Sequence, residues 1–376
     1  ALIKPDLEFR EAIFGLGAHD LTSCYQCGTC SVVCPLSSDA MPFPRKEMVW
    51  VQWGLKDKVL ADPAVWLCHQ CNHCNTYCPR DAKPADVMAA LRDYSITHYA
   101  VPRFMGKAVS EARYLPLLFA FPALIFLAAL AWLGNLTSLP TGQIVYSKFM
   151  PTIYIDVIFN LGVGSAVIAS ILGGRRYWEA MKNEFPPTLT GTGSNRGLIS
   201  TLKEIFKHRS FQSCEGEDRV GERKSFRAHL YKTHLTVFYG FLGLVVTTPS
   251  VAIGLYVVGY LTPWPLWHPV KILGNVSGLA VLAACGVFFY RRLTDREEGG
   301  KNAYWDWLFL SILALTTLTG FLSELLRLGN IPFLAYWVYF IHLVFIFSLL
   351  VYIPYSKFAH FAYRFVAMLY AESKRG

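Results

Sequence analysis

The sequence predicts an all-helical protein in two parts, a small polar N-terminal part and a larger membrane part. Two observations predict this division. Residues 1–114 have the composition of a soluble domain, whereas in 115–376 long apolar runs alternate with short basic segments. A pair of compact cysteine motifs also lies within the first 114 residues. The length of 376 residues suffices for two domains that differ in kind.

The overall composition is that of a membrane protein. The chain is 53% hydrophobic, 15% aromatic and 16% charged, against about 25% charged residues in a soluble domain. A net charge of +9 could indicate a nucleic-acid partner. No basic cluster lies on a recognisable nucleic-acid motif, however, and we expect no nucleic acid. The basic residues flank the apolar runs, which favours a role in membrane orientation and a lipid bilayer as the surroundings.

Six apolar segments are long enough to cross a bilayer, for which a helix needs about 20 residues. Pro122 and Pro354 interrupt the first and the last segment, which membrane helices tolerate. The predicted spans are 115–134, 153–173, 233–259, 272–290, 305–326 and 333–356. In the loop 174–232, residues 199–207 could form an amphipathic helix, either on the membrane surface or simply exposed.

The distribution of basic residues predicts the orientation of these spans. With the N-terminus inside, one side of the membrane holds 174–232 with twelve Lys and Arg, 291–303 with four, and 357–376 with four. The three opposite connections hold one basic residue each: Lys148, Lys271 and Arg327. The positive-inside rule therefore predicts a multi-pass protein of the cytoplasmic (inner) membrane. Both termini, the loop 174–232 and the N-terminal domain are then cytoplasmic.

The two cysteine motifs have the same spacing. Each is a C-x2-C-x2-C-x3-C run followed by proline, starting at Cys24 and at Cys68. A cubane cluster needs four thiolates; this run presents three of them to one cluster, while its fourth cysteine ligates the other. The spacing therefore predicts two [4Fe–4S] clusters. Cluster I takes Cys24, Cys27, Cys30 and Cys78, and cluster II takes Cys68, Cys71, Cys74 and Cys34.

Zinc and disulfides are the alternatives for these cysteines. Zinc sites usually combine separated C-x2-C pairs and close with four ligands, so two four-cysteine runs exceed the need. The start of the chain shows no signal-peptide pattern, which favours reduced, metal-bound cysteines over a disulfide framework. Cys214 and Cys285 lie outside the motifs and are expected to be structural. The 33-residue spacer, with a predicted helix at 45–53, indicates a helical two-cluster ferredoxin.

Histidines in the membrane part indicate a second kind of site, since polar residues in a bilayer are functional candidates. His342 lies in the outer half of the sixth segment and His360 just beyond its inner end. Eighteen residues make five helical turns, which predicts a shared face and a separation of about 27 Å, suited to two stacked haems. His234, near the inner end of the third segment, is level with His360. These two imidazoles predict an inner haem b between the third and sixth helices.

The residue that would join His342 in binding an outer haem stays open. His268, at the outer end of the fourth helix, could complete an outer haem, line a quinone pocket, or sit among interfacial aromatics. Asp156 and Glu324 lie near the outer ends of the second and fifth helices. They could carry protons for quinone chemistry or be structural, and Glu324 is spaced to pair with Arg327. His69 and His73, within the second cysteine motif, are expected to tune the cluster.

The membrane histidines also carry a resemblance. Residues 340–344 and 353–360, with His342 and His360, resemble the last helix of the cytochrome b (gamma) subunit of respiratory nitrate reductase. Residues 234–241 resemble the paired helix of that family, but Leu244 stands where the family carries its second outer histidine. The cysteine domain looks like the small iron–sulfur subunit of heterodisulfide reductase. The fusion is similar to the membrane subunit of quinone-interacting membrane-bound oxidoreductases of sulfate reducers.

This resemblance implies two b haems, menaquinone as substrate, and cytoplasmic flavin and iron–sulfur partner subunits related to heterodisulfide reductase. Those partners serve adenylylsulfate reduction in sulfate respiration. The expected function is electron transfer between menaquinol, haem b, the two clusters and these subunits, within a quinone-dependent oxidoreductase. The chain has no flavin or nucleotide fingerprint, so the cytoplasmic catalytic site belongs to other subunits.

Two other functions remain. One is the membrane subunit of a heterodisulfide or sulfite-reduction complex; the other is a haem-free membrane polyferredoxin for metal-centre assembly. The predicted fold is all-α. It is a helical two-[4Fe–4S] ferredoxin-like domain (1–114) fused to a six-helix transmembrane haem b bundle (115–376).

Overall fold

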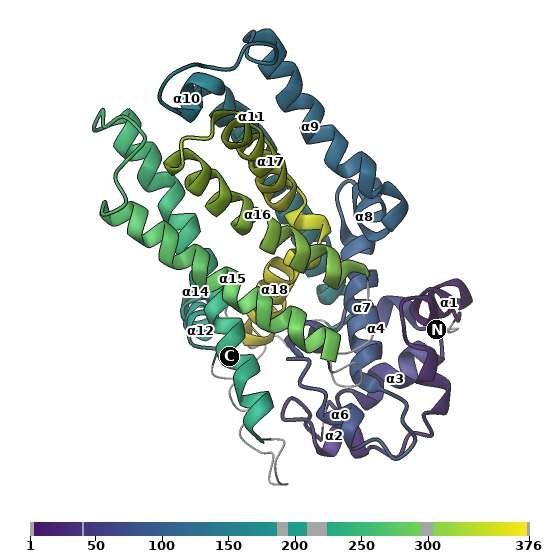
Figure 1. Cartoon of the computed structure of the whole chain (residues 1–376). Coiled ribbons are helices and arrows are strands. Elements are labelled where there is room, and N and C mark those ends of the chain that lie inside the picture. The colour runs from purple at the N-terminus through teal and green to yellow at the C-terminus, as the bar shows by residue number, and fades with distance from the viewer. Residues whose placement is uncertain (1–3, 40, 186–194, 209–223, 295–303, 374–376) are drawn as a thin grey trace.

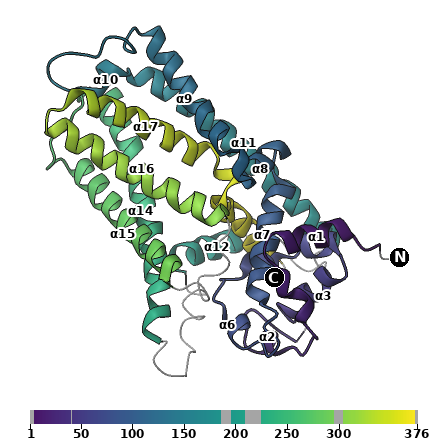
Figure 2. The ribbon, with the colours of Figure 1, turned by 45° about the vertical axis from the view of Figure 1, so that its right-hand side comes forward.

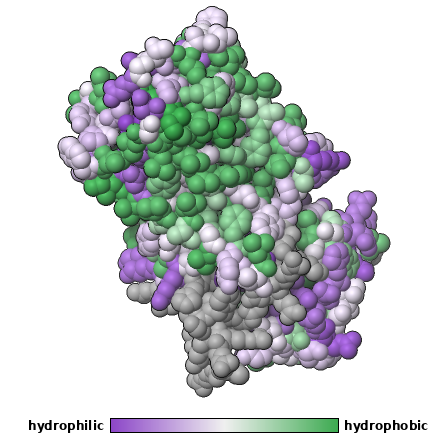
Figure 3. Space-filling view, in the orientation of Figure 1, coloured by the Kyte–Doolittle hydropathy of each residue, from purple (hydrophilic) through white to green (hydrophobic). Residues whose placement is uncertain are grey.

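A computed structural model describes residues 4–39, 41–185, 195–208, 224–294 and 304–373. Every regular element within these ranges is a helix, as predicted. A small lobe carries the N-terminus, and an elongated helical bundle extends from it (Figure 1). Apolar residues cover much of the bundle surface, whereas polar residues are frequent on the small lobe (Figure 3). The hydropathy of the two predicted parts thus corresponds to two regions of the molecule.

Six helices of the bundle are long and apolar enough to cross a membrane, which confirms the predicted number. They are α9 (Leu115–Trp132), α11 (Thr152–Glu184), α14 (Lys224–Tyr256), α15 (Pro269–Thr294), α16 (Tyr304–Leu328) and α17 (Pro332–Val351). The predicted loop 174–232 is partly helical. α11 runs into it, α14 begins within it, and α12 (Asn195–Lys207) includes the predicted amphipathic segment. Pro122 stays inside α9 without ending it.

The sixth membrane helix ends earlier than predicted. α17 stops at Val351 and is followed by two 3₁₀ turns, η4 (Ile353–Tyr355) and η5 (Lys357–Ala359); a separate helix, α18 (His360–Ser373), then begins. Pro354 cannot donate an amide hydrogen bond and disfavours helical geometry in the residue before it. The prediction that His342 and His360 share one face, five turns apart, is therefore wrong, because no continuous helix joins them.

The small lobe, called here the cysteine domain, is built from short helices. α1 (Leu7–Gly15), η1 (His19–Ser23) and α2 (Thr29–Val32) come first, followed by α3 (Arg45–Gln52), α4 (Lys56–Leu60) and α5 (Pro63–Leu67). α6 (His73–Thr76) and α7 (Pro84–Tyr99) follow the second motif, and α8 (Arg103–Ser110) and η2 (Ala112–Tyr114) lead to α9. α3 confirms the helix predicted between the motifs. Figure 2 shows α7 rising from the cysteine domain towards the bundle.

The cysteine domain and the bundle share one hydrophobic core. Buried residues of α1, α3 and α7 pack in the same cluster as Tyr177 and Met181 of α11 and Tyr363 and Tyr370 of α18. The ring of Trp66 stacks on that of Tyr363, with 5.0 Å between centroids. Close packing of this kind resists relative displacement. The end of the bundle that contacts the cysteine domain, called here the near end, therefore holds the cysteine loops at a defined position.

Candidate iron–sulfur and histidine sites

Both cysteine motifs fold into the same loop. The residue before the second cysteine of each motif, Gln26 or Gln70, has a positive φ, of 67° and 56° respectively. The residue after that cysteine, Gly28 or Asn72, is also left-handed, with φ of 84° and 62°. Each loop then enters a short helix, α2 or α6. Two left-handed residues in quick succession curl the backbone, so that three cysteines of one motif face a common space.

The first thiol group combines three cysteines of the first motif with the last of the second. Cys30 interacts electrostatically with Cys24, Cys27 and Cys78. Burial, reinforced by the charges of Cys24 and Cys78, raises the pKa of Cys30 to about 11. Cys24 likewise interacts with Cys78 and Cys27. Cys78, distant in sequence, therefore lies among the thiols of the first loop.

The second thiol group is the reciprocal one. Cys34 interacts with Cys68 and Cys71, and burial raises its pKa to about 12. Cys74 interacts with Cys68, Cys71 and Cys34, and its pKa is raised mainly by burial. All four thiols line one cavity, together with His69 and His73. The last cysteine of each run thus faces the other loop, which is the arrangement that the predicted cross-over pairing requires.

The chemistry of these donors fits iron–sulfur clusters. A buried thiol with a raised pKa resists ionisation, and metal coordination supplies the positive charge that compensates a buried thiolate. Several N–H groups also point at sulfur: the amides of Gln70 and Ala82 lie 3.4 Å from Cys68 Sγ and 3.3 Å from Cys78 Sγ. Such N–H···S contacts are among the factors that set cluster potentials. Across the described ranges, no three His, Cys, Asp or Glu side chains are placed to bind a single metal ion.

Two arginines place positive charge beside the second thiol group. The carbonyl oxygen of Cys68 accepts a hydrogen bond from Arg92 at 2.7 Å and another from Arg364 of α18 at 3.3 Å. Arg364 also donates to His69 Nδ1 at 2.9 Å. Burial and the Arg364 guanidinium lower the pKa of His69 to about 2, so this imidazole is neutral at physiological pH. Arg364 therefore links the second cysteine loop to the bundle by direct hydrogen bonds.

Replacement of Arg364 by glutamine is expected to lower the midpoint potential of the cluster bound by the second thiol group by tens of millivolts. The guanidinium stabilises the additional negative charge of the reduced cluster, and glutamine removes that charge. An EPR-monitored redox titration of the full chain would measure the effect. Arg103→Gln, at an exposed position of α8, is the matched control. An equal shift for both clusters, or no shift, would contradict this role of Arg364.

A group of histidines adjoins this link at the near end of the bundle. His234 of α14 interacts electrostatically with His360 of α18 and with His208, which follows α12. The rings of His208 and His234 are 5.3 Å apart between centroids. His69 also interacts with His208 and His234. The structure thus brings His234 and His360 together and adds His208 and His69.

His360 is oriented for ligation of a metal. Its Nδ1 lies 2.7 Å from the carbonyl oxygen of Lys357. An Nδ1–H donated to a backbone carbonyl leaves Nε2 with its lone pair, which is the usual state of a metal-bound histidine. The side chain of His360 is exposed, so a planar group can reach it. The side chain of His360 is therefore suited to bind the iron of a haem.

His342 lies at the interface of α17 with α16. Its Nδ1 is 3.1 Å from Thr319 Oγ1. Gly320 leaves the room for the imidazole, because a Cβ there would come within 2.9 Å of His342 Cε1. Among the described residues, these contacts of the side chain are with α16, not with α14 or His268. No contact between His342 and His268 is found among the described residues.

The remaining far-end candidates have local partners. His268 packs among aromatic side chains, with 4.3 Å between its ring centroid and that of Trp264. Asp156 accepts a hydrogen bond from the hydroxyl of Tyr256. Glu324 forms an ion pair with Lys271 of α15, at 3.0 Å, rather than with Arg327 as its spacing suggested. The i, i+3 spacing allowed a local pair, but helix packing places a lysine of another helix closer.

Two residues that the structure adds to the candidate site, His208 and Arg364, were not among the sequence-based candidates. His208 lies outside the apolar spans, where no rule selects a histidine. Arg364 follows His360 by four residues and therefore shares its helix face; this spacing was a usable signal. Cys285 is buried in α15, as expected of a structural cysteine. Cys214 lies outside the described residues.

A helical domain with two gathered thiol groups, packed on six apolar helices, defines a membrane-associated iron–sulfur electron-transfer subunit. Comparisons with known proteins support this class. The chain belongs to the Citrate utilization protein B family, whose family model matches residues 107–376. A 4Fe-4S dicluster domain matches residues 20–82.

Three of the matching relatives are similar to parts of the chain. The C subunit of the H(2):CoB-CoM heterodisulfide,ferredoxin reductase of Methanothermobacter thermautotrophicus is 39% identical over 89 residues, covering 23% of this chain and 48% of the relative. A protein of Archaeoglobus profundus named as similar to the C subunit of heterodisulfide reductase is 39% identical over 101 residues, covering 26% and 54%. Citrate utilization protein B of Escherichia coli is 27% identical over 242 residues, covering 62% and 60%.

This chain spans about half the length of the curated relatives that match its cysteine domain. No solved structure matches it. The similarity to the C subunits of heterodisulfide reductases identifies the chain as a redox subunit of oxidoreductase type.

Proposed function

We propose that the chain transfers electrons between menaquinone or menaquinol in the membrane and flavin and iron–sulfur subunits in the cytoplasm. Electrons would travel by way of haem b and two [4Fe–4S] clusters. One observation carries the proposal: the group of His69, His208, His234 and His360 joins the second thiol group to the bundle. A short path between a membrane cofactor and a soluble cluster is what such a protein needs.

In this proposal the two thiol groups hold the clusters in cross-over fashion. Cys24, Cys27, Cys30 and Cys78 bind cluster I, and Cys34, Cys68, Cys71 and Cys74 bind cluster II. His234 and His360 would hold an inner haem b, and the contact of His360 Nδ1 with the carbonyl of Lys357 leaves Nε2 of His360 for the iron. His342 would hold a second haem, and no contact among the described residues supports His268 as its partner. One-electron transfer is the chemistry that these groups supply when bound.

The orientation proposed from sequence places the cysteine domain in the cytoplasm. An even number of spans puts both termini on one side of the membrane. The basic residues, concentrated in 174–232, 291–303 and 357–376, favour the cytoplasmic face of the inner membrane for that side. The clusters would then be accessible to soluble partners, and the quinone pool would meet the bundle.

The identity of the soluble partner is the finer part of the proposal. The resemblance to the membrane subunit of sulfate reducers favours partners related to heterodisulfide reductase that serve adenylylsulfate reduction. Membership of the Citrate utilization protein B family favours instead a partner in citrate utilization. Affinity purification of the chain from its native membrane, with mass spectrometry of what is retained, separates the two. Retention of neither kind of partner would contradict both.

The purified full chain is expected to be reduced by menadiol, a soluble menaquinol analogue. Absorption spectra should show the α band of a b-type haem together with bleaching of the iron–sulfur absorption. Dithionite reduction of the same sample is the reference. Clusters without an α band would support the haem-free polyferredoxin alternative. A haem reduced by dithionite but not by menadiol would contradict the quinone role.

A further inference from the structure

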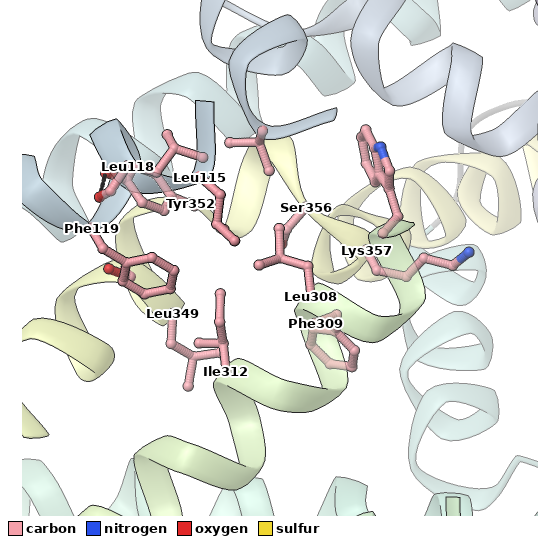
Figure 4. Close-up of a pocket in the computed structure, with 13 residues that line it drawn as sticks. Leu115, Leu118, Phe119, Leu308, Phe309, Ile312, Leu349, Tyr352, Ser356 and Lys357 are labelled. Carbon is pink, nitrogen blue, oxygen red and sulfur yellow. Dashed lines mark hydrogen bonds between the residues drawn. The ribbon is translucent and has the colours of Figure 1, made fainter. Parts of the chain in front are cut away.

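A pocket lies at the near end of the bundle, away from the three far-end candidates for quinone binding. It lies between the start of α9, the start of α16 and the end of α17, and it is partly open to the outside. Its walls are largely apolar and aromatic. The labelled walls are Leu115, Leu118, Phe119, Leu308, Phe309, Ile312, Leu349 and Tyr352 (Figure 4).

One polar side chain in this pocket has an unused donor. Ser348 of α17 lines the pocket and is 1% exposed, and its Oγ has no hydrogen-bond partner among the described residues. Serine and threonine inside helices usually donate to the carbonyl four residues earlier. Thr317 and Ser323 of α16 do so, at 2.9 and 2.8 Å. A buried hydroxyl left without a partner is costly, so Ser348 is suited to a ligand that accepts a hydrogen bond.

The wall of the pocket next to the cysteine domain is held in place by ion pairs whose charged groups do not enter the pocket. The side chain of Lys357 extends away from the pocket in Figure 4, and its Nζ lies 2.6 Å from Asp306 and 3.4 Å from Asp93. The ion pairs join α7, α16 and η5, so they fix the wall next to the cysteine domain while the interior stays apolar.

The pocket is connected to the proposed inner haem ligand by aromatic side chains. Phe309 lines the pocket, and its ring centroid is 4.9 Å from that of Phe358. Phe358 stacks with His360 at 6.5 Å. Lys357, at the pocket wall, is also the residue whose carbonyl contacts His360. A molecule that touches Phe309 in the pocket would therefore be separated from His360 by two phenylalanine rings.

We propose that this pocket binds the headgroup of a quinone, with the Ser348 hydroxyl donating to one carbonyl oxygen. A quinone ring is flat and apolar and accepts hydrogen bonds at two positions, which suits aromatic walls and a single buried donor. Its lining comes largely from α9, α16 and α17, three candidate membrane spans, so the isoprenoid tail can extend into lipid. This inference rests on the proposed function and changes its geometry: the quinone site lies at the near end, not at His268, Asp156 or Glu324.

Binding of 2-heptyl-4-hydroxyquinoline N-oxide, a fluorescent quinol analogue, tests the site without turnover. Fluorescence titration of the detergent-solubilised full chain gives its Kd. Ser348→Ala is expected to raise Kd roughly three- to tenfold, the loss of one neutral hydrogen bond. Ile312→Trp, which fills the pocket, is expected to abolish binding. Leu315→Trp, on the same helix but 39% exposed, is the matched control and should bind as the parent protein does.

The outcomes separate this inference from the proposed function. If the parent chain binds the analogue and is reduced by menadiol, but Ser348→Ala and Ile312→Trp change nothing, the near-end site is wrong. Loss of binding in Tyr256→Phe or Glu324→Gln, with Ser348→Ala unaffected, would overturn it in favour of the far end. If the parent neither binds the analogue nor is reduced by menadiol, the proposed quinone role itself fails. Cluster content, measured as non-haem iron per chain, shows that each variant is folded.

Discussion

Cys78→Ala is expected to remove cluster I, which three cysteines of the first motif would otherwise hold, and to leave cluster II in place. The reason is the placement of Cys78 beside Cys24 and Cys30, although it lies far from both in the chain. A cubane that loses one of four thiolate ligands is expected to be lost or converted to a three-iron form. Non-haem iron should fall to about half that of the parent chain if the cluster is lost, and by about one atom per chain if it becomes a three-iron form.

The reciprocal variant, Cys34→Ala, is expected to remove cluster II alone. Mössbauer spectroscopy counts the clusters, and EPR of the reduced protein distinguishes them by their spectra and potentials. Cys285→Ser, a buried cysteine of the bundle with no role in either thiol group, is the control and should retain both clusters. If Cys78→Ala removed the cluster of Cys68, Cys71 and Cys74 instead, each motif would hold its own cluster and the cross-over pairing would be wrong.

His360→Ala and His234→Ala are each expected to abolish the inner low-spin haem while both iron–sulfur clusters remain. Each variant removes one of two axial bonds, and neither residue belongs to a thiol group. Haem content from the pyridine haemochrome, with EPR of the oxidised protein, measures the loss. His19→Ala, at an exposed position of the cysteine domain, is the control. An unchanged low-spin signal in both variants would contradict the assignment.

Two neighbouring histidines make this experiment sharper. His208 lies 5.3 Å from His234 between ring centroids, so His208→Ala tests whether it, rather than His360, completes the site. We expect His208→Ala to retain the haem with at most a shifted spectrum. His342→Ala is expected to lower the haem content without affecting the inner signal. If total haem is unchanged in His342→Ala, the second haem is absent.

Sequence alone determined the features that depend on local pattern. A bilayer span needs about 20 apolar residues whatever its neighbours, so hydropathy located six helices. Their bounds differ from prediction mainly where helices leave the apolar region, as α11 does by continuing to Glu184. The cysteine spacing likewise predicted two loops of one kind, because the left-handed residues around Cys27 and Cys71 are a property of the loop itself.

Tertiary structure decided everything that depends on contacts between distant elements. Hydropathy extended the last span through Pro354, but the chain leaves the helix after Val351, and His360 begins a new helix that packs on the cysteine domain. That packing brings Arg364 to Cys68 and His69, and the end of α12 brings His208 to His234. Ser348 looks like an ordinary helical serine in the sequence. It becomes a candidate quinone-binding residue only because α9 and α16 leave a pocket beside it and no carbonyl of the described residues accepts its proton. Periodicity cannot reveal the pocket or the unused hydroxyl, because the packing of distant helices sets both.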